Sequence, residues 1–194
     1  YYTGTTGKIM PFFYCVGKAA HVNDYFQGLN SVLLASEIVT KMEANPAFLE
    51  GQGSWLLSPP TCLGFEIRRN GYSVTLPERT VCYFNLLTIE KTPQEILSFC
   101  VGLAQDATSS TLETLKTSED TFIRRGGTSS PLPKIKVLSY SELLNKIRAQ
   151  FKDNETFDRA LKKELSSRQD SFDEREQAIR IIEAIISLSH STEP

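Results

Sequence analysis

The sequence has few of the residues from which a metal centre or a membrane anchor is built. Its two histidines, His21 and His190, are far apart, and no HxH, HxD or HExxH motif occurs. We therefore expect no metal site made from this chain alone. The longest apolar runs, residues 9–16 and 179–188, are much shorter than the roughly 20 residues of a membrane span. No secretory signal pattern opens the sequence, so we expect a soluble, cytoplasmic protein without a membrane partner.

Cysteine and basic charge are also limited. The four cysteines lie far apart in apolar stretches and form no CxxC pair, which is typical of buried thiols in a reducing cytoplasm. Lys and Arg total 21 against 23 Asp and Glu, and no basic stripe is present. Such a balance does not favour binding to a phosphate backbone, so we expect no nucleic-acid partner.

What the chain does have is enough apolar sequence for a sizeable core. Apolar residues make up 40% of its 194 residues, which is ample for one generous domain or for a compact domain with an appendage. The first residue is Tyr1 rather than Met, and strand-like sequence begins almost at once. We therefore expect a piece of a longer protein.

Residue periodicity and turn signals predict six elements in the first part of the chain. Asp24 and Gln27 have the spacing of a helical capping box, and Thr92, Pro93 and Glu95 form a second helix start. The predicted elements are, in order, a strand over 8–18, a helix over about 25–44, strands over 61–69 and 72–89 joined by a turn at Asn70–Gly71, a helix from 93 toward 125, and a short strand over 134–138.

This order predicts an α+β fold of the ferredoxin-like βαββαβ type. Its antiparallel sheet is expected to carry two helices on one face, with the first and third strands in the centre. We assign residues 1–139 to this domain. Three charged helical patterns follow, over 140–151, 155–168 and 172–189, and they predict a helical appendage over 140–194.

His21 is the candidate site residue, because it falls where an apolar strand ends and a helix is about to begin. Side chains at such junctions lie on the rim of a sheet, where ligands and partners are met. The segment around it, Gly17-Lys18-Ala19-Ala20-His21 with Gly28-Leu29-Asn30-Ser31, resembles the signature that opens the lid domain of the zinc-dependent amidohydrolase family. That family includes carboxypeptidase G, aminoacylase and succinyl-diaminopimelate desuccinylase. Residues 81–95 resemble the family's third strand and second helix start.

Within the family, the chain is most similar to the arginine-utilisation proteins. Three segments carry this likeness: residues 2–8 (YTGTTGK), residues 17–22 (GKAAHV) and residues 131–144 (PLPKIKVLSYSELL). Together they extend over most of the chain.

The resemblance implies a role for this chain within a longer hydrolase. Such an enzyme holds two zinc ions in a separate catalytic domain, and its lid domain forms a homodimer. By resemblance, His21 is a catalytic and substrate-binding residue that reaches into the partner subunit's active site. There it donates a hydrogen bond to the developing oxyanion or to a carboxylate of a small amide or amino-acid-derived substrate. Asn85 is a second, weaker candidate for substrate binding, and Leu87 stands where many members carry a substrate-binding Arg. The fragment alone is expected to be inactive and to hold no cofactor.

Two other functions remain open from the residues. A ferredoxin-like domain can act alone as a regulatory or small-molecule-binding module. Residues 12–14 (FFY) also place aromatic side chains on a strand, as in single-strand nucleic-acid binders, although aromatic residues on both faces of a strand are more often part of a core.

Overall fold

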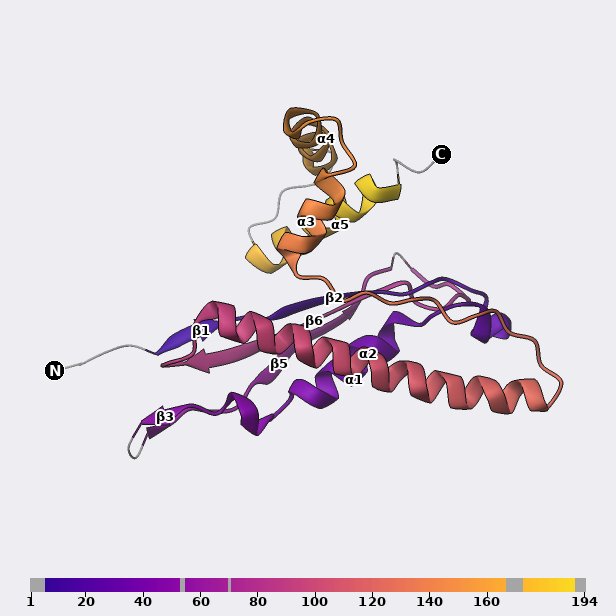
Figure 1. Cartoon of the computed structure of the whole chain (residues 1–194), viewed down its shortest axis with the longest axis horizontal. Coiled ribbons are helices and arrows are strands. Elements are labelled where there is room, and N and C mark those ends of the chain that lie inside the picture. The colour runs from indigo at the N-terminus through magenta and orange to yellow at the C-terminus, as the bar shows by residue number, and fades with distance from the viewer. Residues whose placement is uncertain (1–5, 53–54, 70, 167–172, 191–194) are drawn as a thin grey trace. The chain divides into compact units, whose positions relative to one another are not determined.

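The fold is described from a computed structural model that covers residues 6–52, 55–69, 71–166 and 173–190 (Figure 1). The chain folds into two compact units, residues 1–137 and residues 138–194. The elements are β1 (Gly7–Ile9), β2 (Phe12–Val16), η1 (Val22–Gln27), α1 (Ser31–Met42), η2 (Pro46–Phe48), β3 (Gly51–Gln52), β4 (Trp55–Leu56), β5 (Thr61–Ile67), β6 (Arg79–Thr88), α2 (Pro93–Arg124), α3 (Tyr140–Arg148), α4 (Asn154–Ser166) and α5 (Glu174–His190).

The first unit is built on an antiparallel sheet with β6 in the centre. Strands β1 and β2 pair with successive parts of β6 along one edge, and β5 pairs with its other edge. Met10 and Pro11 interrupt the predicted first strand, since neither belongs to a strand. A second, two-stranded sheet is formed by β3 and β4.

The core lies between one face of this sheet and helices α1 and α2. The residues of β6 that face the helices are Cys82, Phe84 and Leu86, and all are buried. Phe13 of β2 meets Phe84 edge to face, with 5.9 Å between ring centroids. This packing assigns Phe13 to the core. Among the described strands β2 pairs only with β6, so β6, the predicted third strand, is central, but the prediction that the first strand is also central is wrong. The reason is that residues 134–138, predicted to form the fourth strand of the sheet, form no strand.

The α+β class, the antiparallel sheet and the C-terminal helices are confirmed, while the bounds of several predicted elements differ and one predicted strand is absent. The first long helix begins at Ser31 rather than near 25, because the preceding residues form the separate turn η1 and Asn30 is the N-cap. Asp24 and Gln27, the predicted capping pair, do not cap α1. Their side chains form a 3.4 Å hydrogen bond, from Gln27 Nε2 to Asp24 Oδ1.

The fourth strand predicted over 134–138 is absent, since these residues form neither helix nor strand. Leu132, Ile135 and Val137 nevertheless pack against the core. Their apolar spacing is therefore satisfied by side-chain burial, while Pro131 and Pro133 supply no N–H for a ladder. The third strand also begins later than predicted, at Arg79, and Asn70 of the predicted turn lies outside the described residues.

The second unit consists of α3, α4 and α5 around its own small core of Ile147, Phe157, Ile185 and Leu188. Helix α3 starts with a capping box between Ser139 and Glu142. None of the helices in the described ranges is long and apolar enough to cross a membrane.

Candidate functional site

The loop that carries His21 is held by close backbone contacts with the segment before α1. Lys18 and Leu29 exchange two backbone hydrogen bonds, of 2.8 and 2.9 Å. Glycine is required on both sides of this contact. A Cβ on Gly17 would lie 2.9 Å from the Ser31 nitrogen and still closer to the Leu29 carbonyl oxygen, and a Cβ on Gly28 would lie 2.6 Å from the Lys18 carbonyl oxygen. The two glycines of the motif therefore allow the loop to close.

The last two residues of the motif also have structural roles. Asn30 caps α1, because its side-chain oxygen accepts a 2.9 Å hydrogen bond from the Val32 N–H. Ser31 is fully buried, and its hydroxyl donates to the Pro77 carbonyl oxygen at 3.0 Å and lies 2.7 Å from the Thr80 hydroxyl. These bonds fix the start of α1 against the start of β6.

His21 differs from the other motif residues, since its side chain is exposed on the rim. Its backbone bridges Thr75 in an antiparallel pairing, and its ring nitrogen Nδ1 accepts a 3.2 Å hydrogen bond from the Asn23 N–H. Val22, which follows His21, and Val74, which precedes its partner Thr75, are also exposed apolar side chains. The arrangement can present an imidazole to a partner or ligand.

The second sequence candidate, Asn85, lies elsewhere on the sheet. It is half-buried on β6, opposite Thr61 of β5. Asn85 lies six residues along the strand from Arg79, where β6 begins, which corresponds to about 20 Å of strand. The His21 loop pairs with residues before Arg79, so His21 and Asn85 do not form a joint site within one chain, and the role of Asn85 stays a prediction.

No metal centre forms among the residues that the structure describes, because no three side chains of the His, Cys, Asp and Glu types lie close enough together. Burial raises the pKa of the Cys15 thiol to about 12 and that of Cys100 to about 11. Such thiols stay protonated and are poor ligands. His190 ends α5, and its side chain is outside the described part of the chain.

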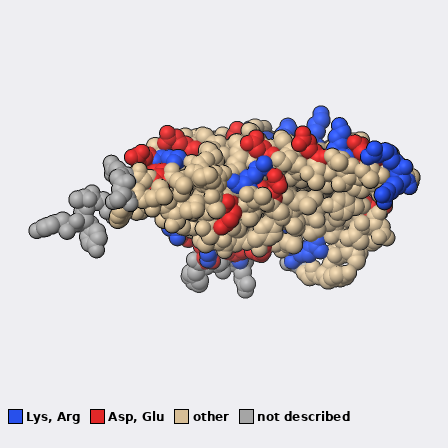
Figure 2. Space-filling model, turned by 90° about the horizontal axis from the view of Figure 1, so that it is seen from below, with Lys and Arg blue, Asp and Glu red and all other residues tan. Residues whose placement is uncertain are grey.

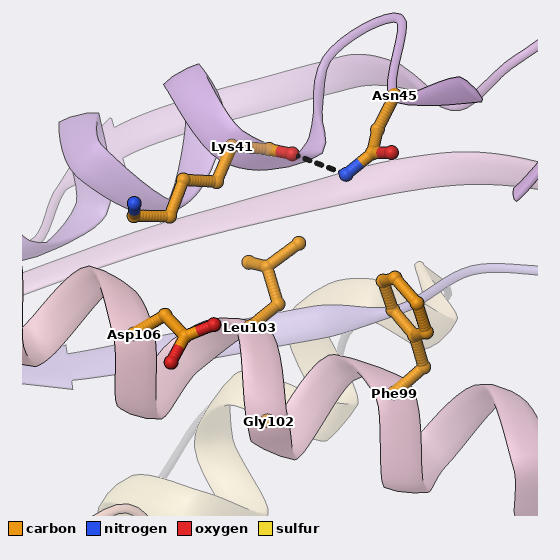
Figure 3. A pocket seen from close by; sticks show the side chains of 6 residues that line it. All are labelled: Lys41, Asn45, Phe99, Gly102, Leu103 and Asp106. Carbon is orange, nitrogen blue, oxygen red and sulfur yellow. Dashed lines mark hydrogen bonds between the residues drawn. The ribbon is translucent and has the colours of Figure 1, made fainter. Parts of the chain in front are cut away.

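A pocket of about 430 Å³ lies between the end of α1 and the first half of α2 (Figure 3). Lys41 and Asp106 bring opposite charges to it, and Phe99 and Leu103 form an apolar wall. Both polar atoms of the Asn45 side chain already form hydrogen bonds with nearby backbone groups. Its Nδ2 donates to the Lys41 carbonyl oxygen at 2.7 Å, and its Oδ1 accepts from the Ala47 N–H. No sequence pattern indicated this pocket, because it lies between two helices that are about 50 residues apart in the chain.

Charged side chains of both signs occur together on the face of the molecule shown in Figure 2, with wide uncharged areas between them. The largest group of Lys and Arg lies at one end of that face, and the others are scattered among acidic and uncharged residues. A continuous basic surface, of the kind that binds nucleic acid, is not visible in this view.

Comparison with known proteins finds two relatives and no matching family description. The chain is 29% identical to protein RocB of Bacillus subtilis over 153 residues, which are 76% of this chain and 26% of RocB. It is 27% identical over 195 residues to the uncharacterized protein YqjN of the same organism, covering 100% of this chain and 35% of YqjN. The chain thus spans about a quarter to a third of the relatives that it matches.

Proposed function

We propose that this chain is the dimerisation and lid domain of a zinc-dependent amidohydrolase-like protein of arginine utilisation. In this proposal His21 acts in trans, in the active site of the partner subunit. The similarity to RocB supports the link to arginine-utilisation proteins. Both RocB and YqjN have the additional length that a catalytic domain requires.

The observation that carries the proposal is the contrast within the His21 motif. Gly17, Gly28, Asn30 and Ser31 are each accounted for by contacts that shape the loop. His21 instead holds its ring at the surface, and its one hydrogen bond to a described residue is made through Nδ1. A loop built this tightly around an exposed imidazole favours a role for that side chain outside its own domain.

The chemistry assigned to this chain is hydrogen bonding rather than metal binding. The two zinc ions belong, in this proposal, to the rest of the longer protein, since the described residues bring no ligand set together. An imidazole beside the scissile carbonyl can donate to the oxygen on which negative charge develops. One such donor stabilises the transition state by roughly 3 to 4 kcal/mol.

The free edge of β5 supports dimerisation. Among the described strands, β5 pairs only with β6, and it exposes Leu63, Phe65 and Ile67. Exposed apolar edge strands are usually covered or paired, and a two-fold axis beside such a strand joins two sheets into one. We therefore assign the homodimer contact to β5 and the neighbouring α1.

The dimer contact is tested by placing lysines on this edge. Phe65→Lys with Ile67→Lys is expected to weaken self-association of the full-length protein by about tenfold or more, the scale of losing a well-packed contact. Leu97→Lys on α2 is the matched control, because Leu97 is 42% exposed, as is Ile67. Sedimentation equilibrium measures both. Equal association of the edge variant and the control would assign the dimer to another surface.

A small-molecule-binding regulatory domain is the second candidate, and the pocket between α1 and α2 favours it. Its opposite charges, from Lys41 and Asp106, suit a zwitterion such as a free amino acid. Calorimetric titration with arginine separates the two functions. Saturable binding that is lost in Gly102→Leu, which fills the pocket, supports the regulatory function, and absence of binding leaves the lid function alone.

A further inference from the structure

The backbone on both sides of His21 is fixed by hydrogen bonds to the loop before β6. The Leu76 N–H donates to the Ala20 carbonyl oxygen at 2.9 Å, and the Val22 N–H donates to the Val74 carbonyl oxygen at 3.0 Å. His21 and Thr75 lie between these two bonds as an antiparallel pair. The position of the His21 Cα and the direction of its side chain are therefore set by a short piece of sheet.

The ring itself is held by the turn that it caps. His21 is the N-cap of η1, and its Nδ1 accepts the Asn23 N–H at 3.2 Å. The His21 carbonyl oxygen also accepts the Asp24 N–H at 2.8 Å. The first N–H groups of a helix have no partner within the helix, so a side-chain acceptor at the N-cap satisfies one of them.

This capping bond determines where the imidazole proton lies. A ring nitrogen that accepts a hydrogen bond directs its lone pair at the donor and cannot carry a proton. A neutral imidazole has a single ring proton, which must then be on the other nitrogen. For His21 that nitrogen is Nε2, the ring atom farther from the backbone.

We infer that the backbone N–H of Asn23 holds His21 in the neutral tautomer protonated on Nε2, so that the exposed ring presents a hydrogen-bond donor. The group that it fits is an oxygen with a lone pair, in a carbonyl or a carboxylate. The use of this donor in amide hydrolysis rests on the proposed function, whereas the tautomer follows from the loop alone.

The same bond argues against two other uses of the ring. A histidine that binds a metal through Nε2 needs a lone pair there and usually donates its Nδ1 proton to an oxygen. In His21 both positions are reversed, since Nδ1 accepts and Nε2 carries the proton. A general base at Nε2 would need the same lone pair. Asn23 is thus a positioning residue, and it acts through its main chain.

The tautomer can be measured by ¹⁵N NMR of the imidazole ring in this chain. The chain has two histidines, so His190→Gln leaves a single set of ring signals. Relative to the same protein unfolded in urea, the population protonated on Nδ1 is expected to fall about fivefold, as one hydrogen bond of average net strength would cause. An Nδ1-protonated population that is equal in the folded and unfolded protein would overturn the inference.

Two substitutions of Asn23 separate the amide from the side chain. Asn23→Ala keeps the N–H and is expected to leave the tautomer ratio unchanged. Asn23→Pro removes the N–H at a position in the first turn where proline is tolerated, and it is expected to return the ratio to its value in urea. An unchanged ratio in folded Asn23→Pro contradicts the inference. If this variant does not fold, the comparison of folded and unfolded wild type decides alone.

These spectra need no zinc, substrate or dimer. A confirmed tautomer with a full-length protein that is monomeric would disprove the proposed function but leave the inference standing. An active dimer in which His21 has the other tautomer would disprove the inference but leave the proposed function standing.

Discussion

The buried carboxylate of Glu50 accepts a hydrogen bond from the Thr88 hydroxyl at 2.9 Å, which ties the segment after α1 to the end of β6. The same carboxylate accepts the N–H groups of Ile89, Glu90 and Lys91 at 2.8, 2.6 and 3.2 Å. Burial alone would raise the pKa of Glu50, but these hydrogen bonds outweigh it and lower the pKa to about 2. The turn that leads into α2 is therefore organised around one charge.

Glu50→Gln is expected to reduce the free energy of unfolding by about 1 to 3 kcal/mol, because an amide cannot accept every hydrogen bond that the carboxylate does. Urea denaturation followed by circular dichroism measures the change. Glu90→Gln is the control, since Glu90 is an exposed residue of the same turn. Equal stability of the two variants would show that the Glu50 cluster contributes nothing specific.

The first unit is also expected to become less stable as the pH falls. The pKa of Glu50 is lower in the folded protein, about 2, than its ordinary value of 4.5. Its contribution is therefore fully present above about pH 4.5 and is lost as the pH falls toward 2. Unfolding free energies measured across this range should decline less steeply in Glu50→Gln. Parallel curves for both proteins would assign the acid sensitivity to other groups.

Two glycine substitutions are expected to act in opposite directions. Gly17→Ala forces a methyl group against the backbone of Leu29 and Ser31, and we expect it to cost about 3 kcal/mol or more. Gly102→Ala in α2 meets no atom within 4 Å, and it is expected to stabilise the helix by about 0.5 to 1 kcal/mol. Thermal unfolding compares them. A harmless Gly17→Ala would contradict the tight loop described around His21.

The four thiols are expected to differ in reactivity according to burial. Cys15, Cys82 and Cys100 are buried, and burial raises the pKa of each. Cys62 is only half-buried, although burial also raises its pKa. Labelling with a thiol reagent at pH 8 should modify Cys62 first and the other three only on unfolding. Rapid labelling of all four in the folded protein would disprove this order.

Elements with complete local signals could be predicted from the sequence, and those decided by distant contacts could not. The start of α2 has its N-cap, proline and capping-box Glu95 within four residues, and the structure forms this capping box. The start of α1 depends instead on the pairing of Lys18 with Leu29. Gly28, next to this pairing, has an extended backbone, so the helical turn η1 does not continue into α1. A periodic pattern cannot reveal such a pairing between segments of chain.

The candidate site shows the same division. The junction position of His21 was visible from the apolar strand before it and the helical pattern after it. The orientation of the His21 ring depends on the Asn23 N–H and on the backbone pairing with Thr75. Neither interaction involves the side chain of Asn23 or of Thr75. Almost every residue type has a main-chain N–H donor, so sequence patterns carry no information about which of these donors is used.

The most direct test of the account uses mixed dimers of the full-length protein. His21→Ala alone is expected to lower kcat by about 100- to 1,000-fold, with little change in melting temperature. It is mixed with a variant inactivated in the proposed zinc-binding domain, and amide hydrolysis is measured after subunit exchange has been verified. If His21 acts in trans, heterodimers contain one site with both an intact metal centre and an intact histidine, and activity returns. Mixed dimers that stay inactive, or a His21→Ala enzyme with full turnover, would contradict the proposed role.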